Sequence, residues 1–251
     1  MLKKLDEYHN SALENFKKKN FKAAIDIYHE IIKVEKNNSN LYLNIAISYQ
    51  ELREYHNAKN FYHKALKINP NNVTANINLG AIFRRLGELN EAKNCYQKAL
   101  KIEPNSLLAN FNFGNIYIEL NDLLEAKRYF EKVIEIDQNF VEAHFNLANI
   151  LRSLGENNNA INSYKKTIQI NPDHSFALYN LGVLLNELGD FKKASIYFLK
   201  AIEFESVKRT ASVQYASTLL LSNQHLKALK IFAKNQSVIR FTPLKYNIID
   251  L

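Results

Sequence analysis

The sequence has few of the residues from which catalytic, metal-binding or disulfide-stabilised sites are built. A single cysteine, Cys95, excludes an intramolecular disulfide, and we expect it to be a small core residue. The seven histidines show no metal-ligand spacing with carboxylates or with Cys95. There is no glycine-rich phosphate loop and no nucleophile motif. We therefore expect a protein that is not an enzyme and that needs no metal or other cofactor.

Long apolar runs are missing as well, so no membrane span is predicted. The chain opens with Met1-Leu2-Lys3-Lys4 and leads directly into a charged segment, which is not a secretory signal, and we expect a cytoplasmic protein. Glycine and proline are also scarce, at six and four residues in 251. Most of them recur at one distance, since Pro70 and Pro104 lie 34 residues apart and Pro172 lies two such periods further on.

This period of 34 residues organises nearly the whole chain. If Val73 is position 1, three columns hold one kind of residue in all seven repeats. Position 8 is small: Ala12, Ala46, Gly80, Gly114, Ala148, Gly182 and Ala216. Position 20 is alanine: Ala24, Ala58, Ala92, Ala126, Ala160, Ala194 and Ala228. Position 24 is aromatic: Tyr28, Tyr62, Tyr96, Phe130, Tyr164, Phe198 and Phe232.

Each repeat has the pattern of two helices joined by a tight turn. Large apolar residues recur at steps of three and four, and small residues at positions 8 and 20 allow the two helices to approach closely. Position 15 holds Gly87, Gly155 and Gly189, or Asn121 and Asn223, which tolerate the left-handed backbone that ends a helix. A helix pair of this kind buries its apolar stripe only by stacking on its neighbours.

These columns resemble the tetratricopeptide repeat, and the resemblance covers residues 5–235. It implies an all-α, right-handed superhelical α-solenoid of about seven tandem helix-turn-helix repeats, forming one elongated domain. We expect a lead-in at 1–4 and an apolar C-terminal tail or unfinished eighth repeat at 236–251. The repeats themselves span 5–38, 39–72, 73–106, 107–140, 141–174, 175–208 and 209–235.

The column that bears most on function is position 6, which carries a carboxamide in every repeat: Asn10, Asn44, Asn78, Asn112, Asn146, Asn180 and Gln214. In tetratricopeptide superhelices this position faces the concave groove. The column is similar to the asparagine ladder in the repeat region of O-GlcNAc transferase, which implies a grip on the backbone of an extended peptide. The other interpretation is that these residues serve packing or a helix-to-helix hydrogen bond.

The resemblance implies a peptide-binding site centred on the fourth to sixth repeats. Its polar floor would be Asn78, Asn112, Asn115, Asn146, Asn149 and Asn180. An apolar rail at position 5 would be Phe111, Phe145 and Tyr179. Arg84 and Arg152 would pair with acidic side chains of the ligand, or else be solvated charges at the rim.

The sequence thus predicts a protein-interaction scaffold whose partner is another protein. One alternative is the peptide-recognition arm of a glycosyltransferase system resembling O-GlcNAc transferase. Another is a nucleic-acid-associated adaptor, suggested by the net charge of +8 and a row of lysines at position 26. Glutamates such as Glu131 and Glu135 alternate with that row, so we expect a solvated surface and no nucleic-acid binding. The pattern predicts no particular oligomeric state.

Overall fold

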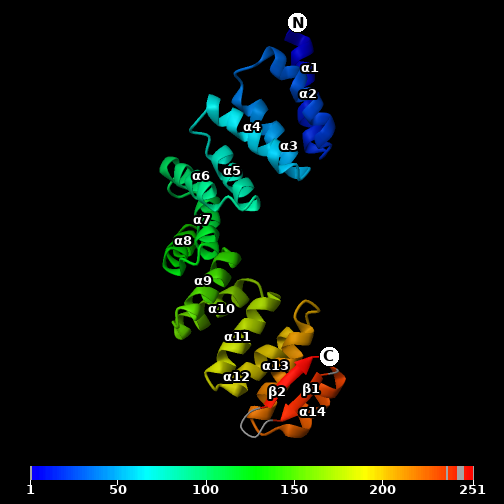
Figure 1. Cartoon of the computed structure of the whole chain (residues 1–251), viewed down its shortest axis with the longest axis vertical. Coiled ribbons are helices and arrows are strands. Elements are labelled where there is room, and N and C mark those ends of the chain that lie inside the picture. Colours follow the sequence, from blue (N-terminus) through cyan, green and yellow to red (C-terminus); the bar gives the residue numbers. More distant parts are fainter. Residues whose placement is uncertain (1, 236, 242–245, 251) are drawn as a thin grey trace. The chain divides into compact units, whose positions relative to one another are not determined.

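The computed structural model describes residues 2–235, 237–241 and 246–250, and in this part of the chain helices follow one another in pairs (Figure 1). We call the first helix of each repeat the A helix and the second the B helix. The A helices are α1 (Leu2–Lys17), α3 (Ser39–Glu51), α5 (Val73–Arg85), α7 (Leu107–Glu119), α9 (Val141–Ser153), α11 (Ser175–Glu187) and α13 (Lys208–Leu221). The B helices are α2 (Phe21–Val34), α4 (Tyr55–Ile68), α6 (Leu89–Ile102), α8 (Leu123–Ile136), α10 (Asn157–Ile170), α12 (Phe191–Ala201) and α14 (His225–Lys234). The predicted all-α repeat fold is confirmed.

The turn between the A and B helices has the same backbone conformation in every repeat. Position 15 has a positive φ at the three expected glycines, with values of 77° to 80°, and at Asn121 and Asn223. Lys19 and Arg53 occupy the same column in the first two repeats and adopt φ values of 61° and 60°. The left-handed turn is therefore imposed by the repeat, because two residues with full side chains accept a conformation that glycine adopts without strain.

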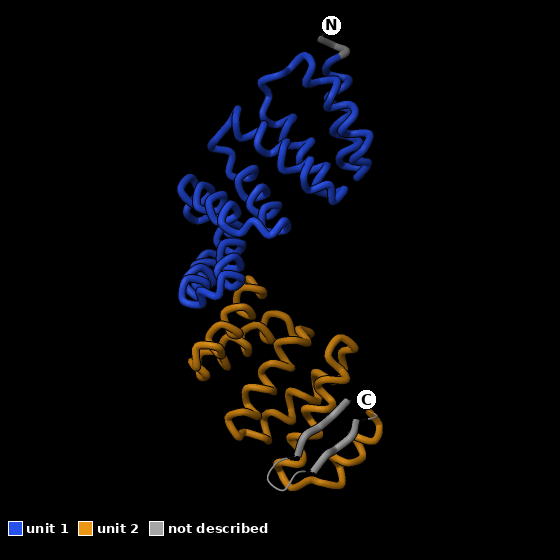
Figure 2. Tube along the Cα trace, viewed as in Figure 1, with its two compact units in different colours: residues 1–136 blue, residues 137–251 orange. Residues whose placement is uncertain are grey.

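The chain divides into two compact units, residues 1–136 and 137–251, which we describe separately (Figure 2). In unit 1 each A helix packs against the B helix of its own repeat, and each B helix packs against the next A helix, from α1 to α8. Helices α9 to α14 follow the same scheme in unit 2. The apolar stripe of each helix pair is therefore covered by its neighbours, as the pattern predicts.

The three constant columns form the core within each repeat. The alanines at position 20 are all fully buried, and so are the rings at position 24, none of which is more than 2% exposed. A Cβ added at Gly80 would lie 2.8 Å from the Tyr96 ring, and one at Gly182 would lie 2.8 Å from the Phe198 ring. Position 8 is small because the position 24 ring of the partner helix packs directly on it. Burying each ring contributes about 1.5–3 kcal/mol.

In three consecutive repeats the residue at position 4 links the A helix to the connection that precedes it. The Asn76 side chain donates from Nδ2 to the Pro70 carbonyl oxygen at 3.2 Å, and Asn110 donates to that of Pro104 at 3.0 Å. The next repeat uses His144, whose Nε2 lies 3.0 Å from the Gln138 carbonyl oxygen. Asn76, Asn110 and His144 are at most 8% exposed, so these bonds satisfy buried polar groups.

The two ends of the chain differ from the central repeats. Helix α1 already begins at Leu2, inside the lead-in expected at 1–4. The strands β1 (Ser237–Phe241) and β2 (Tyr246–Asp250) pair antiparallel, with Ile239 opposite Ile248. An eighth repeat would begin with a helix, so these described residues do not begin one. The side chains of the tail lie outside the described residues.

None of the helices in the described part of the chain is both long enough and apolar enough to span a bilayer.

Candidate functional site

The carboxamides at position 6 lie on the A helices, and all except the exposed Asn10 are half-buried. In the second and third repeats they meet the position 24 tyrosine of the preceding repeat. Asn44 donates from Nδ2 to the Tyr28 hydroxyl oxygen at 3.2 Å. The Asn78 side chain hydrogen-bonds the Tyr62 hydroxyl, which itself donates to Gln50 Oε1 at 2.7 Å. Asn44 and the predicted floor residue Asn78 therefore also link successive repeats.

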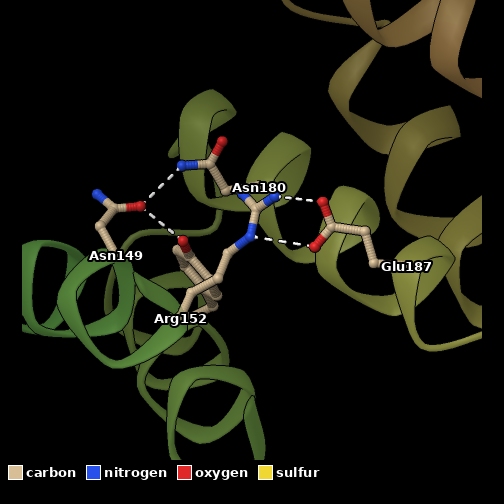
Figure 3. Close-up of polar contacts among 5 residues, drawn as sticks. Asn149, Arg152, Asn180 and Glu187 are labelled. Atoms are coloured by element: carbon tan, nitrogen blue, oxygen red, sulfur yellow. Dashed lines mark hydrogen bonds and ion pairs between the residues drawn. The ribbon is translucent and has the colours of Figure 1, made fainter. Parts of the chain in front are cut away.

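In unit 2 the same columns form a three-residue network around Asn149 (Figure 3). The Asn149 Oδ1 atom accepts a hydrogen bond from the Tyr164 hydroxyl at 2.6 Å and another from Asn180 Nδ2 at 2.9 Å. Asn149 occupies position 9 of its repeat, and Asn180 occupies position 6 of the next. One side-chain oxygen thus satisfies both a buried hydroxyl and a groove carboxamide.

Burial keeps the tyrosine hydroxyls in this layer protonated. Desolvation raises the pKa of Tyr62 and of Tyr164 above the ordinary value. The Asn78 side chain at Tyr62, and the Arg152 charge followed by the Asn180 side chain at Tyr164, oppose this rise in pKa only in part. The hydroxyls are therefore hydrogen-bond donors at neutral pH. Each needs an acceptor, because an unsatisfied buried polar group costs free energy.

These internal bonds leave part of each carboxamide unused. An asparagine side chain offers two N–H donors and an oxygen with two lone pairs, and the bonds of Asn44 and Asn180 each use one donor. Asn115 and Asn146 are half-buried on α7 and α9 and also interact with neighbouring residues. The remaining donors and acceptors of the half-buried carboxamides can serve a ligand.

The predicted apolar rail packs on the core of its own repeats. Its rings lie against the position 24 ring of the same repeat, at centroid distances of 5.7 Å for Phe111 and Phe130 and 6.2 Å for Phe145 and Tyr164. Tyr179 lies 6.1 Å from Phe198 in the same way. The three rail residues are only half-buried. Phe145 also lies 4.6 Å from the His174 ring. The core therefore holds the three rings in place, and each remains partly exposed.

The two predicted arginines already have partners within their own units. Arg84 donates from Nε to Glu119 Oε1 at 2.6 Å. Arg152 donates from Nη2 to Glu187 Oε1 at 2.5 Å and from Nε to Glu187 Oε2 at 3.3 Å (Figure 3). Both pairs join position 12 of one repeat to position 13 of the next. The glutamate partners were not predicted, although each lies 35 residues after its arginine, one residue more than the repeat.

A hollow beside Arg84 in unit 1 was not predicted from the sequence. It measures about 450 Å³ and is lined by Ala81, Arg84, Arg85, Tyr96, Asn112 and Glu119. Tyr96 is fully buried, and its hydroxyl has no hydrogen-bond partner among the residues that the structure describes. Position 9 could have indicated this hollow, because it is Ala81 in this repeat and an asparagine, Asn115 or Asn149, in the next two repeats. A small residue beside the tyrosine removes the acceptor that Asn149 provides in unit 2.

Comparison with known proteins identifies the repeat. Models of the tetratricopeptide repeat match residues 37–103, 71–139, 129–162 and 177–207, and a model described as TPR repeat matches residues 148–189. Together these matches extend over more than half of the chain. A comparison with curated proteins found no match.

Solved structures of similar fold include the MamA protein, with 27% identity, a TM-score of 0.62, and coverage of 68% of this chain and 94% of MamA. The protein YrrB, described as a TPR protein with an unusual peptide-binding site, is 24% identical, with a TM-score of 0.63 and coverage of 82% and 97%. The C-terminal part of a TPR repeat-containing protein from Cytophaga hutchinsonii is 19% identical, with a TM-score of 0.76 and coverage of 89% and 92%. Sequence and fold agree, and the chain belongs to the tetratricopeptide repeat family of protein-interaction scaffolds.

Proposed function

We propose that the chain holds an extended segment of a partner protein against the exposed side of its A helices. In unit 1 the contacts are Asn78 and Asn112, and in unit 2 they are Asn146, Asn149 and Asn180. The observation that carries this proposal is the unused hydrogen-bonding capacity of half-buried carboxamides that recur once per repeat. A peptide backbone presents an N–H and a carbonyl at each residue, which are the complements of a carboxamide.

The aromatic rail supports the same proposal. Phe111 in unit 1, and Phe145 and Tyr179 in unit 2, stand one residue before a position 6 carboxamide, and each is held on its inner side by a core ring. An apolar side chain of the bound segment gains area on such a surface, while the carboxamides bind its backbone. The arrangement selects weakly for sequence, because the strongest polar contacts are to the backbone.

The magnitude of binding follows from these contacts. Each net hydrogen bond contributes about 0.5–1.5 kcal/mol, and ordering the flexible segment removes part of this gain. We therefore expect micromolar affinity, which corresponds to about 8 kcal/mol.

The test is selection from a random peptide display library by the intact protein, followed by affinity measurement on the recovered peptides. A variant with Asn112, Asn146 and Asn180 all changed to alanine is expected to bind them at least about tenfold more weakly, from the loss of three such bonds. The matched control changes Asn60, Asn94 and Asn162 to alanine, because these exposed asparagines share position 22 of the B helices. The proposal requires that the control keeps full affinity.

Stability must be measured on the same variants, because Asn180 also bonds Asn149. Asn112→Ala gives the cleanest single change, since within the described part of the chain the Asn112 carboxamide makes no hydrogen bond. We expect it to lose affinity without lowering the melting temperature. Unchanged peptide affinity in the triple variant would refute the proposed function. Early melting with unchanged affinity would show that the carboxamides are structural.

A further inference from the structure

The hollow in unit 1 occupies the same repeat positions as the hydrogen-bond network in unit 2, but it lacks one hydrogen-bond acceptor. Unit 2 has Asn149 at position 9, Tyr164 at position 24 and Asn180 at position 6 of the next repeat, and Asn149 Oδ1 accepts from both of the others. Unit 1 repeats the tyrosine and the position 6 carboxamide as Tyr96 and Asn112. Position 9 is Ala81, so the shared oxygen is missing.

Two groups that can donate hydrogen bonds line this hollow. The Tyr96 hydroxyl is buried and has no partner in the described part of the chain, and the Asn112 side chain lines the same hollow. Desolvation raises the pKa of Tyr96, so the hydroxyl remains a donor at neutral pH. An oxygen atom brought in by a ligand would satisfy the hydroxyl, and this removes the cost of a buried polar group without a partner.

The charges around the hollow favour an anionic oxygen. Two guanidinium groups, Arg84 and Arg85, line it together with one carboxylate, Glu119. Arg84 is bonded to Glu119 through Nε alone, at 2.6 Å, whereas Arg152 of unit 2 uses both Nε and Nη2 on Glu187. Position 13 adds to the difference, since it is Arg85 in unit 1 and Ser153 in the corresponding repeat of unit 2. The hollow in unit 1 therefore lacks a hydrogen-bond acceptor and has an excess of positive charge.

We propose that this hollow binds the carboxylate of an aspartate or glutamate side chain in the partner segment. One carboxylate oxygen accepts from the Tyr96 hydroxyl and from the Asn112 amide, in the place that Asn149 Oδ1 takes in unit 2. The other oxygen accepts from the guanidinium of Arg84 or Arg85. The inference rests on the proposed peptide-binding function and adds to it a preference for acidic residues at one subsite.

The experiment uses the full chain and four pools of random decapeptides, whose central residue is aspartate, glutamate, asparagine or glutamine. The intact protein is expected to retain the two acidic pools about fivefold to tenfold better than the two amide pools, because hydrogen bonds to charged groups are stronger than neutral ones. This preference should weaken as salt is raised, since the arginines are at the surface.

Two variants place residues of unit 2 at the corresponding positions of unit 1, and we therefore expect both to fold. Ala81→Asn supplies the missing oxygen from the protein itself, and we expect it to abolish the acid preference while keeping or raising the melting temperature. Arg85→Ser removes the additional positive charge at an exposed position, and it should reduce the acid preference without reducing retention of the amide pools. Tyr96→Phe removes the buried donor and should lower retention of the acidic pools.

The outcomes separate this inference from the proposed function. Equal retention of acidic and amide pools by the intact protein would overturn the inference alone. An acid preference that survives in Ala81→Asn would also overturn it, because the acid would then bind elsewhere and the hollow would hold only water. If no pool is retained, the proposed function fails, and the inference fails with it.

Discussion

Tyr96 and Tyr164 are buried at position 24 of two repeats, and we expect the removal of their hydroxyls to have different effects on stability. Replacing Tyr96 and Tyr164 by phenylalanine removes the same hydroxyl from the same column, yet the two hydroxyls differ in their partners. The Tyr164 hydroxyl donates to Asn149 Oδ1 at 2.6 Å, whereas the Tyr96 hydroxyl has no hydrogen-bond partner within the described ranges. Phe130 and Phe198 fill this column in other repeats and are fully buried, so the site accepts the phenyl ring.

The two substitutions should therefore have opposite effects on stability. Tyr164→Phe loses one hydrogen bond and is expected to lower the free energy of unfolding by about 0.5–1.5 kcal/mol. Tyr96→Phe removes a desolvated hydroxyl without an acceptor, which costs about 1–3 kcal/mol, so we expect a gain of about 1 kcal/mol in the absence of ligand. The variants should then differ by roughly 2 kcal/mol, which is a factor of about 30 in a local unfolding equilibrium.

Native-state hydrogen exchange is the suitable assay, because a repeat protein opens in parts and a single global transition would average over the repeats. Amides of α6 should be better protected in Tyr96→Phe than in the intact protein, and amides of α10 should be less protected in Tyr164→Phe. Equal loss of protection in both variants would show that the Tyr96 hydroxyl has an acceptor. That result would refute the reasoning on which the carboxylate subsite depends.

Two further predictions concern the turn and the cysteine. Gly155 has φ of +77° and an added Cβ would meet nothing within 4 Å, so Gly155→Ala should cost only conformational strain, about 1 kcal/mol by urea unfolding. Gly155→Asn should cost less, because Asn121 and Asn223 occupy the same column; equal losses would contradict a purely backbone origin. Burial raises the pKa of Cys95 from 9.0 to about 11, so folding favours the protonated thiol, and its contribution to stability is present below pH 9 and lost between pH 9 and 11. The urea midpoint of the intact protein should fall more steeply over that range than that of Cys95→Ala, and parallel curves would refute the assignment.

The bounds of the helices and the nature of the turns could be predicted from the sequence, because they depend on residues close together in the chain. Every B helix begins at position 17, and five A helices begin at position 1 of their repeats, from Ser39 to Ser175. The glycines and asparagines of position 15 indicated the left-handed turn. Lys19 and Arg53 did not, because their side chains do not favour that conformation and only the surrounding helix pair imposes it.

The candidate site was predictable only in outline. The columns of asparagines, aromatic residues and arginines indicated which residues share the side of the A helices, since a helix repeats its faces every three to four residues. They did not indicate which of these side chains already form hydrogen bonds within the protein. Asn44 and Asn180 were predicted as groove residues, and the structure shows that both also bond within the protein.

The sequence by itself therefore determined the repeat, its helices and the residues that line one side of them, since each follows from local spacing. Only the tertiary structure decided which of their polar atoms are satisfied. The acceptor of Tyr164 comes from another helix of its repeat, that of Arg84 comes from the next repeat, and Tyr96 lacks one because Ala81 lies where unit 2 has an asparagine. Such pairings depend on atoms brought within 3 Å by the stacking of helices, and a single small residue in one column changes them.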